Sequence, residues 1–197
     1  MLELNDERGA PVRLDPDAFI IAGYTGRDPE SVDWYDMPPS LLTTAESIAV
    51  ATSQSCGEVE PVLIGSDGRI YLGIGSDHAA RDVEREDVER SRRACPKPLG
   101  RSLLRVGVLD EAFDALQLES WVDGEAYQSG TVSQIIPLQT LLSGFRSRRS
   151  SPSFVLYCGT VPLLTDGFRY GEKFSARISG AKLPAPLTLD YTTVVEK

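Results

Sequence analysis

Thirteen prolines and seventeen glycines are spread along the whole chain of 197 residues, and they limit its fold more than any other feature. Because both residue types interrupt regular structure, only short apolar segments remain between them. The longest apolar runs, such as residues 18–22 and 154–158, have five residues. A membrane-spanning helix needs about 20. Short apolar segments between turn residues favour strands, so the sequence predicts a strand-rich chain without a membrane span.

Nine segments are expected to be strands: residues 12–14, 19–22, 47–51, 58–64, 70–74, 115–122, 153–158, 173–178 and 187–195. Opposite charges three and four residues apart predict an exposed helix over residues 82–94. Apolar 3-4 spacing predicts a second helix over residues 132–145, and residues 109–115 form a weaker helical segment. Residues 28–40 show no clean period and are expected to be an irregular connection. Many strands with a few separate helices predict an α+β fold, mainly β, built on a folded or barrel-like sheet.

Charge and cysteine content limit the possible partners and compartments. The net charge is −9, which argues against a general affinity for nucleic acid. The first seven residues are acidic where a signal peptide is basic and then apolar, so a cytoplasmic location is expected. The basic residues at 146–149 are expected to lie in an exposed loop. Three cysteines, Cys56, Cys95 and Cys158, without a C-x-x-C pair predict reduced, partly buried thiols.

Two acids that flank one apolar residue, Glu58 and Glu60, form the most informative motif. On a strand, residues i and i+2 point the same way, so both carboxylates would share one face. Such pairs are common in an acidic chain, as Asp15 and Asp17 show, and a solvated face is the simple alternative. Here the segment continues into Pro-Val-Leu-Ile, so the strand enters a core. Carboxylates beside a core are costly unless a positive charge neutralises them.

The sequence leaves two kinds of positive partner open. Arg81 and Lys97 are possible partners within the chain. The other is a divalent cation, because three carboxylates from Glu58, Glu60 and Asp77 would suit Mg²⁺ or Mn²⁺. Both ions are hard and prefer oxygen ligands, including water at open positions.

Several segments, in order, resemble motifs of the fumarylacetoacetate hydrolase (FAH) family. The segment G-E-V-E-P-V-L-I-G from residue 57 resembles its E-x-E strand, and S-D-H-A-A-R-D from residue 76 is similar to its D-x-[ST]-A-R-D segment. C-P-K-P-L-G from residue 95 matches the place of its active-site lysine. W-V-D-G-E-A-Y-Q-S-G-T from residue 121 resembles its V-N-G-E hairpin, F-V-L-Y-C-G-T-V-P from residue 154 its G-T-P turn, and Y-G-E-K-F from residue 170 its P-G-D step. These motifs lie within residues 55–195. I-A-G-Y-T-G-R-D from residue 21 carries a more specific resemblance to a bacterial branch known as a domain of unknown function.

The resemblance implies a fold, a cofactor and a substrate class. The fold would be a mixed β-roll or partly open barrel with a few peripheral helices, usually dimeric. Residues 1–54 would supply N-terminal strands and a shortened lid-like connection, and residues 55–197 the catalytic domain. Mg²⁺ or Mn²⁺ would be held by Glu58, Glu60 and Asp77. The substrates would be small 1,3-dicarbonyl or 2-oxo acids, most simply cleaved by C–C bond hydrolysis through an enolate.

Two basic residues receive roles from the resemblance. Lys97 would place a positive charge on the developing negative oxygen or carbanion, although a surface lysine between two prolines is the alternative. Arg81 could bind a substrate carboxylate by a bidentate contact, or could pair with Asp77 or Asp82.

Three further residues are candidates for substrate binding. Gly159 and Thr160 could bring a backbone N–H and a hydroxyl to a substrate oxygen, or could simply form a tight turn. Gln128 could supply an amide contact.

The chain departs from the family at the general base. The hydrolases and decarboxylases of the family activate water with a His–Glu dyad on a mobile N-terminal segment, but residues 28–40 contain no histidine. The only histidine is His78, which could act as a base or as a hydrogen-bonding residue beside the site. On a strand end it would point away from Asp77. Oxo-acid decarboxylation or tautomerisation, or a catalytically silent ligand-binding role, therefore remain as alternatives to hydrolysis.

Overall fold

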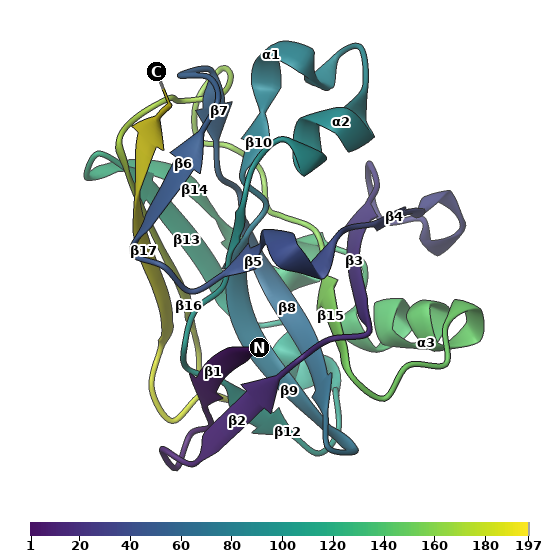
Figure 1. The fold of residues 1–197 in the computed structure, drawn as a ribbon. Coiled ribbons are helices and arrows are strands. Elements are labelled where there is room, and N and C mark those ends of the chain that lie inside the picture. Colours follow the sequence, from purple (N-terminus) through teal and green to yellow (C-terminus); the bar gives the residue numbers. More distant parts are fainter. Residues whose placement is uncertain (197) are drawn as a thin grey trace.

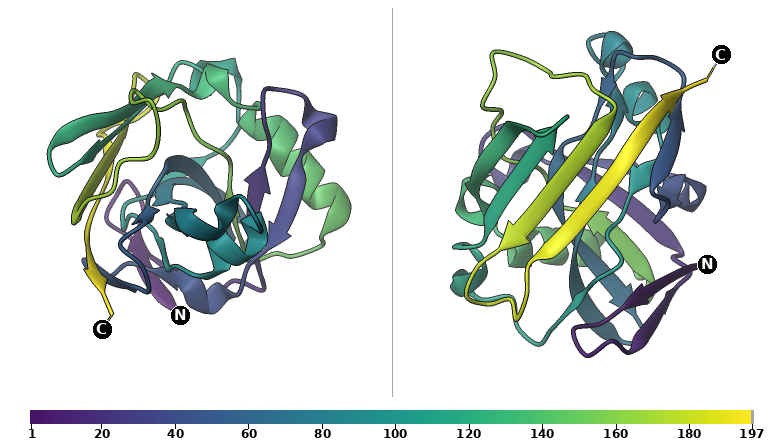
Figure 2. Two further views of the ribbon diagram at one scale, coloured as in Figure 1. Left: turned by 90° about the horizontal axis from the view of Figure 1, so that it is seen from above. Right: turned by 90° about the vertical axis from the view of Figure 1, so that its left-hand side faces the viewer.

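Two twisted sheets pack face to face in the computed structural model, which describes residues 1–196 (Figure 1). One sheet has six strands, in the spatial order β12 (Leu104–Val106), β9 (Arg69–Ser76), β8 (Val59–Ser66), β15 (Phe154–Tyr157), β3 (Ala18–Gly23) and β4 (Asp33–Asp36). The other has five, in the order β14 (Glu125–Thr131), β13 (Gln117–Val122), β16 (Lys173–Ser179), β17 (Leu187–Val195) and β6 (Ser47–Val50). The two sheets curve around each other without closing into a barrel (Figure 2).

Shorter elements complete the fold. Three two-stranded ladders pair β1 (Leu2–Asn5) with β2 (Pro11–Leu14), β7 (Ser55–Cys56) with β10 (Ala79–Ala80), and β5 (Leu42–Thr43) with β11 (Lys97–Pro98). The α-helices are α1 (Arg81–Glu84), α2 (Val88–Arg93) and α3 (Leu138–Arg148). Single 3₁₀ turns span Pro29–Ser31, Pro39–Leu41, Glu111–Phe113 and Val132–Gln134. The α+β, mainly β prediction is confirmed, and residues 1–54 contribute strands to both sheets.

Two Asp-Gly turns set the register of the principal hairpins. Asp67 and Gly68 join β8 to β9 with φ values of 50° and 71°, and Asp123 and Gly124 join β13 to β14 with 51° and 85°. Two-residue loops with both φ values positive have the twist that antiparallel strands require, and Asp-Gly is among their preferred sequences. The first of these turns decides which residues face each other at the far end of the β8–β9 hairpin.

The hydrophobic core has two parts, one on each face of the six-stranded sheet. The larger part includes Leu63 and Leu118 and lies between the two sheets. The smaller part includes Val62 and Tyr157 and lies under the β1–β2 ladder. Helix α3 packs on the same face of the six-stranded sheet as the larger core part, where the rings of Phe145 and Phe154 have centroids 4.4 Å apart. The alternation of Val62 and Leu63 between the two core parts follows from the strand period of two.

All nine predicted strands are present, but three other predictions are wrong in detail. The predicted helix over residues 82–94 is two helices, because Asp87 has extended φ and ψ and caps a new helix by accepting from the Arg90 N–H. The predicted helix over residues 132–145 begins only at Leu138, since Pro137 holds the residue before it extended. Residues 28–40, expected to be irregular, contain the edge strand β4.

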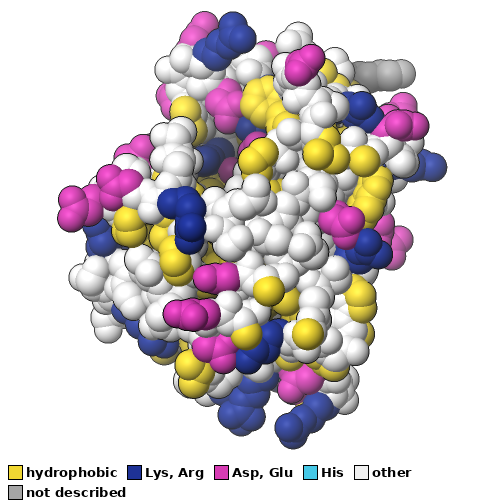
Figure 3. All heavy atoms as spheres, turned by 180° about the vertical axis from the view of Figure 1, so that it is seen from behind, with side chains coloured by type: hydrophobic (Ala, Val, Ile, Leu, Met, Phe, Trp, Pro, Cys, Tyr) yellow, Lys and Arg dark blue, Asp and Glu magenta, His cyan; other side chains and the backbone are white. Residues whose placement is uncertain are grey.

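The surface and the cysteines complete the comparison with the sequence. The cluster at residues 146–149, expected in a loop, mostly continues α3 to Arg148, where positive charge suits the helix C-terminus. All three cysteines are free and buried, as expected. Acidic and basic side chains are interspersed over the face shown in Figure 3. Within residues 1–196, no helix is long and apolar enough to cross a membrane.

Candidate functional site

The three predicted metal ligands lie on one face of the β8–β9 hairpin. Val59 pairs with Ser76, and the Asp77 N–H donates to the Glu58 carbonyl at 3.0 Å, so Asp77 stands opposite Glu58. Directly opposite residues of an antiparallel pair share a face, and so do residues two apart on one strand. Glu58, Glu60 and Asp77 therefore project to the same side, as the E-x-E pattern predicted for the first two.

Three cations of the chain surround these carboxylates. The Arg81 Nη2 lies 2.8 Å from Glu58 Oε2. The Arg92 Nε lies 2.9 Å from Asp77 Oδ2, and the Lys97 Nζ lies 3.2 Å from Asp77 Oδ1. Three negative and three positive groups thus form a nearly balanced cluster. Its members are almost completely buried, and only the side chains of Glu58, at 18%, and Arg92, at 14%, keep appreciable exposure.

Burial and neighbouring charges shift the pKa values of the three carboxyl groups in different directions. Burial, followed by the negative charge of Asp77, raises the pKa of Glu60 well above its usual value. Burial also raises the pKa of Glu58, although Arg81 opposes this shift. Burial alone would raise the pKa of Asp77, but Lys97 and Arg92 outweigh it and lower this pKa. Negative charge at Glu60 is therefore the least compensated within the cluster.

The donor set fits a hard divalent ion in kind, but the present side-chain arrangement is closed by ion pairs. Among residues 1–196, buried Asp77 Oδ1 accepts no hydrogen bond, and Glu60 accepts one, at Oε2 from the Gly159 N–H. Within the described part of the chain, however, no three Asp, Glu, His or Cys side chains are arranged to hold a metal ion. Glu58 is turned toward Arg81 instead. A bound ion would require Glu58 and Asp77 to exchange cation contacts for metal contacts.

Lys97 is buried among carbonyl oxygens rather than exposed between its two prolines. Its side chain has no exposed area, and its Nζ donates to the carbonyls of His78, Arg92 and Cys95. These bonds use the three N–H groups of the ammonium, so its contact with Asp77 Oδ1 is an ion pair without a well-aligned hydrogen bond. Burial lowers the pKa of Lys97, and Asp77 opposes the shift. Lys97 therefore links its own segment to His78 and to the C-terminal end of helix α2.

Gln128, Thr160 and Gly159 hold the strand that carries the two glutamates. The Gln128 Oε1 accepts from the Val59 N–H at 2.9 Å, and the Thr160 hydroxyl donates to the Val59 carbonyl at 2.7 Å. The Gln128 Nε2 in turn donates to Thr160 Oγ1 at 2.7 Å. The Gly159 N–H donates to Glu60 Oε2 at 2.8 Å. The groups that the sequence assigned to substrate thus bind protein atoms, and they fix Val59 from both sides.

His78 lies on the opposite side of the strand end from Asp77, as expected. Its Nε2 is 3.1 Å from Ser55 Oγ, and its Nδ1 is 2.8 Å from the Tyr191 hydroxyl. Ser55 donates its one hydrogen to the Thr52 carbonyl, so we assign the proton of the imidazole to Nε2. Burial, with Lys97, lowers the pKa of His78 to about 3. The ring is therefore neutral and fully hydrogen-bonded at neutral pH.

Sequence reasoning missed Arg92, which the structure places beside Asp77. Its guanidinium stacks on the ring of Tyr35 at 4.4 Å. The neighbouring Arg93 is instead an exposed residue paired with Glu89. The charge pattern of residues 82–94 does not distinguish the two arginines, because the partner of Arg92 lies on a distant strand. No sequence signal in this chain alone could have selected it.

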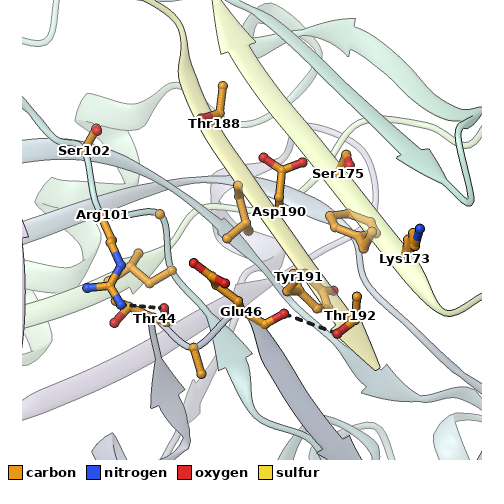
Figure 4. Close-up of a pocket in the computed structure, with 15 residues that line it drawn as sticks. Thr44, Glu46, Arg101, Ser102, Lys173, Ser175, Thr188, Asp190, Tyr191 and Thr192 are labelled. Atoms are coloured by element: carbon orange, nitrogen blue, oxygen red, sulfur yellow. Dashed lines mark hydrogen bonds between the residues drawn. The ribbon is translucent and has the colours of Figure 1, made fainter. Parts of the chain in front are cut away.

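An open groove of about 480 Å³ lies elsewhere, along β16 and β17 (Figure 4). Its charged lining includes Glu46, Arg101, Lys173 and Asp190. None of the nine predicted site residues, all of which the structure describes, lines this groove. Tyr191 lines the groove, and its hydroxyl bonds His78, next to Asp77 in the sequence. The groove is therefore separate from the carboxylates.

Comparisons with known proteins agree with this architecture. Residues 26–191 match a family described as "Protein of unknown function (DUF2848)". The chain belongs to this family. A search of curated proteins found no match.

Solved structures share the fold of this DUF2848 protein over nearly its whole length. A protein from Oleispira antarctica with the provisional name fumarylacetoacetate isomerase/hydrolase is 21% identical, with a TM-score of 0.72, over 98% of this chain and 100% of that one. A provisionally named fumarylpyruvate hydrolase from Burkholderia cenocepacia is 16% identical, with a TM-score of 0.73, over 99% and 95%. The 5-carboxymethyl-2-hydroxymuconate delta-isomerase from Mycobacterium smegmatis is 21% identical, with a TM-score of 0.69, over 95% and 82%. The fold is thus FAH-like, as the sequence motifs predicted.

Proposed function

We propose that this DUF2848 protein is a divalent-metal-dependent enzyme acting on small 1,3-dicarbonyl or 2-oxo acids, most simply as a C–C bond hydrolase. One observation carries the proposal: Glu58, Glu60 and Asp77 share one face of a hairpin, where Glu60 and Asp77 are buried and Glu58 is partly buried. Three neighbouring carboxylates supply the oxygen ligands that Mg²⁺ and Mn²⁺ prefer, and the charge of Glu60 is the least compensated of the three. The names of the structural neighbours, which include hydrolases and isomerases of small acids, support the same class.

The residues around the carboxylates would have different roles in the reaction. A bound divalent ion would supply Lewis-acid stabilisation of a substrate enolate. If Glu58 turned to such an ion, Arg81 would lose that contact and keep Glu84, while Arg92 beside Asp77 would hold a second positive charge near the substrate. Fixed positive groups in a water-poor site stabilise developing negative charge strongly. Lys97 would keep Asp77 ionised and in place.

Gln128, Thr160, Gly159 and His78 would position this site rather than contact substrate. The first three hold the backbone of Val59 and the carboxylate of Glu60. His78 would fix its own carbonyl, to which Lys97 donates.

A second candidate function, decarboxylation or tautomerisation of oxo acids, rests on the environment of His78. Both ring nitrogens are engaged, by Ser55 and Tyr191, so the only histidine has no free lone pair for activating water. Hydrolysis needs an activated water, whereas decarboxylation forms its carbanion without one. Product analysis separates the two candidates, because a decarboxylase releases CO₂ and a hydrolase forms a pair of acids.

The test combines metal analysis with turnover of an acylpyruvate-type substrate. We expect turnover to require Mg²⁺ or Mn²⁺ and to stop on chelation. Glu60→Gln should abolish both metal binding and turnover, while Glu119→Gln, which changes a glutamate on the other sheet, should leave both intact. Full activity of Glu60→Gln would reject the metal site. Tight binding of an oxo acid without product would instead support the catalytically silent alternative.

A further inference from the structure

The Arg81 end of the carboxylate cluster is covered by a loop, residues 165–170, in the connection from β15 to β16 (Figure 2). The Phe168 ring of this loop stacks on the Arg81 guanidinium at 4.3 Å. The Arg81 side chain is only 2% exposed, whereas Phe168 is 39% exposed, so the ring lies between the guanidinium and solvent. Because Arg81 is the partner of Glu58, Phe168 covers the ion pair that would have to open before Glu58 could reach a metal ion.

Both ends of the 165–170 loop are anchored to the β13–β14 hairpin. Before the loop, the Leu164 N–H donates to the Tyr127 carbonyl at 2.8 Å. After it, the Glu172 N–H donates to Asp123 Oδ1 at 3.1 Å. A Cβ at Gly171 would lie 2.4 Å from Asp123 Oδ2, so the chain packs directly against the hairpin turn at this end. The two ends of the loop are therefore fixed points about which the residues between them can move.

Between these fixed ends, the loop makes no hydrogen bond to the rest of the described chain. Among residues 1–196, the only hydrogen bond of residues 165–170 lies within the loop, from the Thr165 hydroxyl to the Gly167 carbonyl. The stacking of Phe168 on Arg81 is thus the contact that fastens the loop over the cluster. A surface segment with few hydrogen bonds to its surroundings opens locally at a small cost in free energy.

The opposite end of the cluster is closed by regular structure instead. There the ring of Tyr35 stacks on the Arg92 guanidinium at 4.4 Å. Tyr35 belongs to β4, where it pairs with Ile21 of β3, and a Cβ at Gly23 would lie 2.7 Å from its ring. The ring is therefore packed against backbone within a sheet, and moving it would disturb the β3–β4 ladder. Phe168 is the cover that can move with the smaller loss of contacts.

We propose that residues 165–170 form a gate over the carboxylate cluster and that Phe168 holds the gate closed through Arg81. In the closed state the ring and the Glu58–Arg81 ion pair seal this end of the cluster. Opening lifts the ring from the guanidinium and admits a metal ion and a small acid to the Glu58 side. The inference rests on the proposed function for what passes the gate, whereas the gate itself depends only on the contacts of the loop.

Cys56 lies beside the gate and can report its opening. Its Sγ accepts from Arg81 Nε at 3.3 Å and lies 3.5 Å from the Tyr127 hydroxyl, and the residue is buried. The preceding residue, Ser55, lines a cavity of about 580 Å³ together with Tyr170 of the gate. Movement of the loop would therefore expose the Cys56 thiol to a small reagent.

The test is the rate at which methyl methanethiosulfonate modifies each cysteine of the metal-free protein, followed by mass spectrometry. Phe168→Ala removes the ring over Arg81, and Leu164→Ala removes another exposed apolar side chain at the anchored end of the loop. We expect Phe168→Ala to raise the rate at Cys56 about tenfold, because the contact that closes the gate is lost. Cys95 and Cys158, which are buried after α2 and β15, should keep their rates, and Leu164→Ala should react like the wild type.

The inference is overturned if Cys56 reacts at the wild-type rate in Phe168→Ala, or if all three cysteines accelerate together, since that would mean general unfolding. An equal acceleration at Cys56 in Leu164→Ala would also overturn it. If Phe168→Ala does not fold, Phe168→Leu replaces it, because leucine keeps an apolar side chain but loses the aromatic face, and Cys56 should again react faster. Failure of the proposed function is a separate result: a protein whose Cys56 rate depends on Phe168 but which binds neither Mg²⁺ nor Mn²⁺ keeps the gate and rejects the metal-dependent enzyme.

Discussion

His78 should make the protein lose stability in mild acid. Its pKa is about 3 in the folded chain, mainly because of burial, and about 6.5 for an unfolded chain. A group with a lowered basic pKa contributes stability above its unfolded value and loses it as the pH falls toward its folded value. Between pH 7.5 and pH 5 the unfolded imidazole takes up a proton while the folded one stays neutral. The linkage relation gives a loss of about 2 kcal/mol over this range.

The assay is urea unfolding of metal-free protein at pH 7.5 and pH 5, for the wild type and for His78→Gln. Glutamine can donate to Ser55 and accept from Tyr191, so it replaces the imidazole hydrogen bonds without a titrating group. The raised pKa values of Glu58 and Glu60 act in the opposite direction, because their protonation favours the fold. They contribute equally to both proteins and cancel in the difference. The wild type should therefore lose about 2 kcal/mol more than the variant.

Equal losses of stability in the two proteins would refute this reasoning, since they would mean that His78 titrates alike in both states. A direct check needs no variant. The chain has one histidine, so its imidazole resonances are unambiguous. They should show no titration between pH 8 and pH 5 in the folded protein, with the proton on Nε2.

Three further substitutions test the structure around the carboxylates by chemical denaturation. Lys97→Met should cost about 3–5 kcal/mol, because it removes one of the two cations beside buried Asp77 and the donors to three carbonyls, whereas Lys182→Met, at an exposed pair, should cost far less. Similar losses for the two lysines would contradict the buried placement. Gly159→Ala should cost about 1–3 kcal/mol, since φ is +88° and the new Cβ would lie 2.3 Å from the Tyr24 hydroxyl; a neutral result would exclude this close approach. Gln128→Leu should cost at least about 2 kcal/mol through the loss of its bonds to Val59 and Thr160, and should weaken Mg²⁺ binding in parallel. Unchanged Mg²⁺ affinity in that variant would show that the Gln128 amide does not position the carboxylates.

The strands and the shared face of the carboxylates could be predicted from the sequence, because both depend on local patterns. Each of the nine short apolar segments predicted as a strand is a strand in the structure, and the period of two placed Glu58 and Glu60 on one face. The two helix errors arose at single residues. Pro137 and Asp87 changed the backbone conformation locally, while the charge and apolar patterns continued across them.

The partners of the site residues could not be predicted, because they depend on contacts between distant segments. Arg92 and Arg93 are neighbours in one charged helix, yet only the first reaches Asp77. Similarly, Gln128 looks like a free amide in the sequence, but it lies opposite β8 once the two sheets pack together. Whether a side chain already has hydrogen-bond or ion-pair partners depends on tertiary packing, and sequence spacing gives no signal for it.

The attachment of Val59 to Gln128 has a consequence for how substitutions in the core could act on the carboxylates. Gln128 belongs to the five-stranded sheet, and Val59 lies between the two glutamates on the six-stranded one. The position of the glutamate pair relative to the five-stranded sheet is therefore tied to the spacing between the sheets. Exchanging bulky and small side chains in the shared interior would adjust that spacing, and would move Glu58 and Glu60 relative to Gln128 while all three residues stay the same.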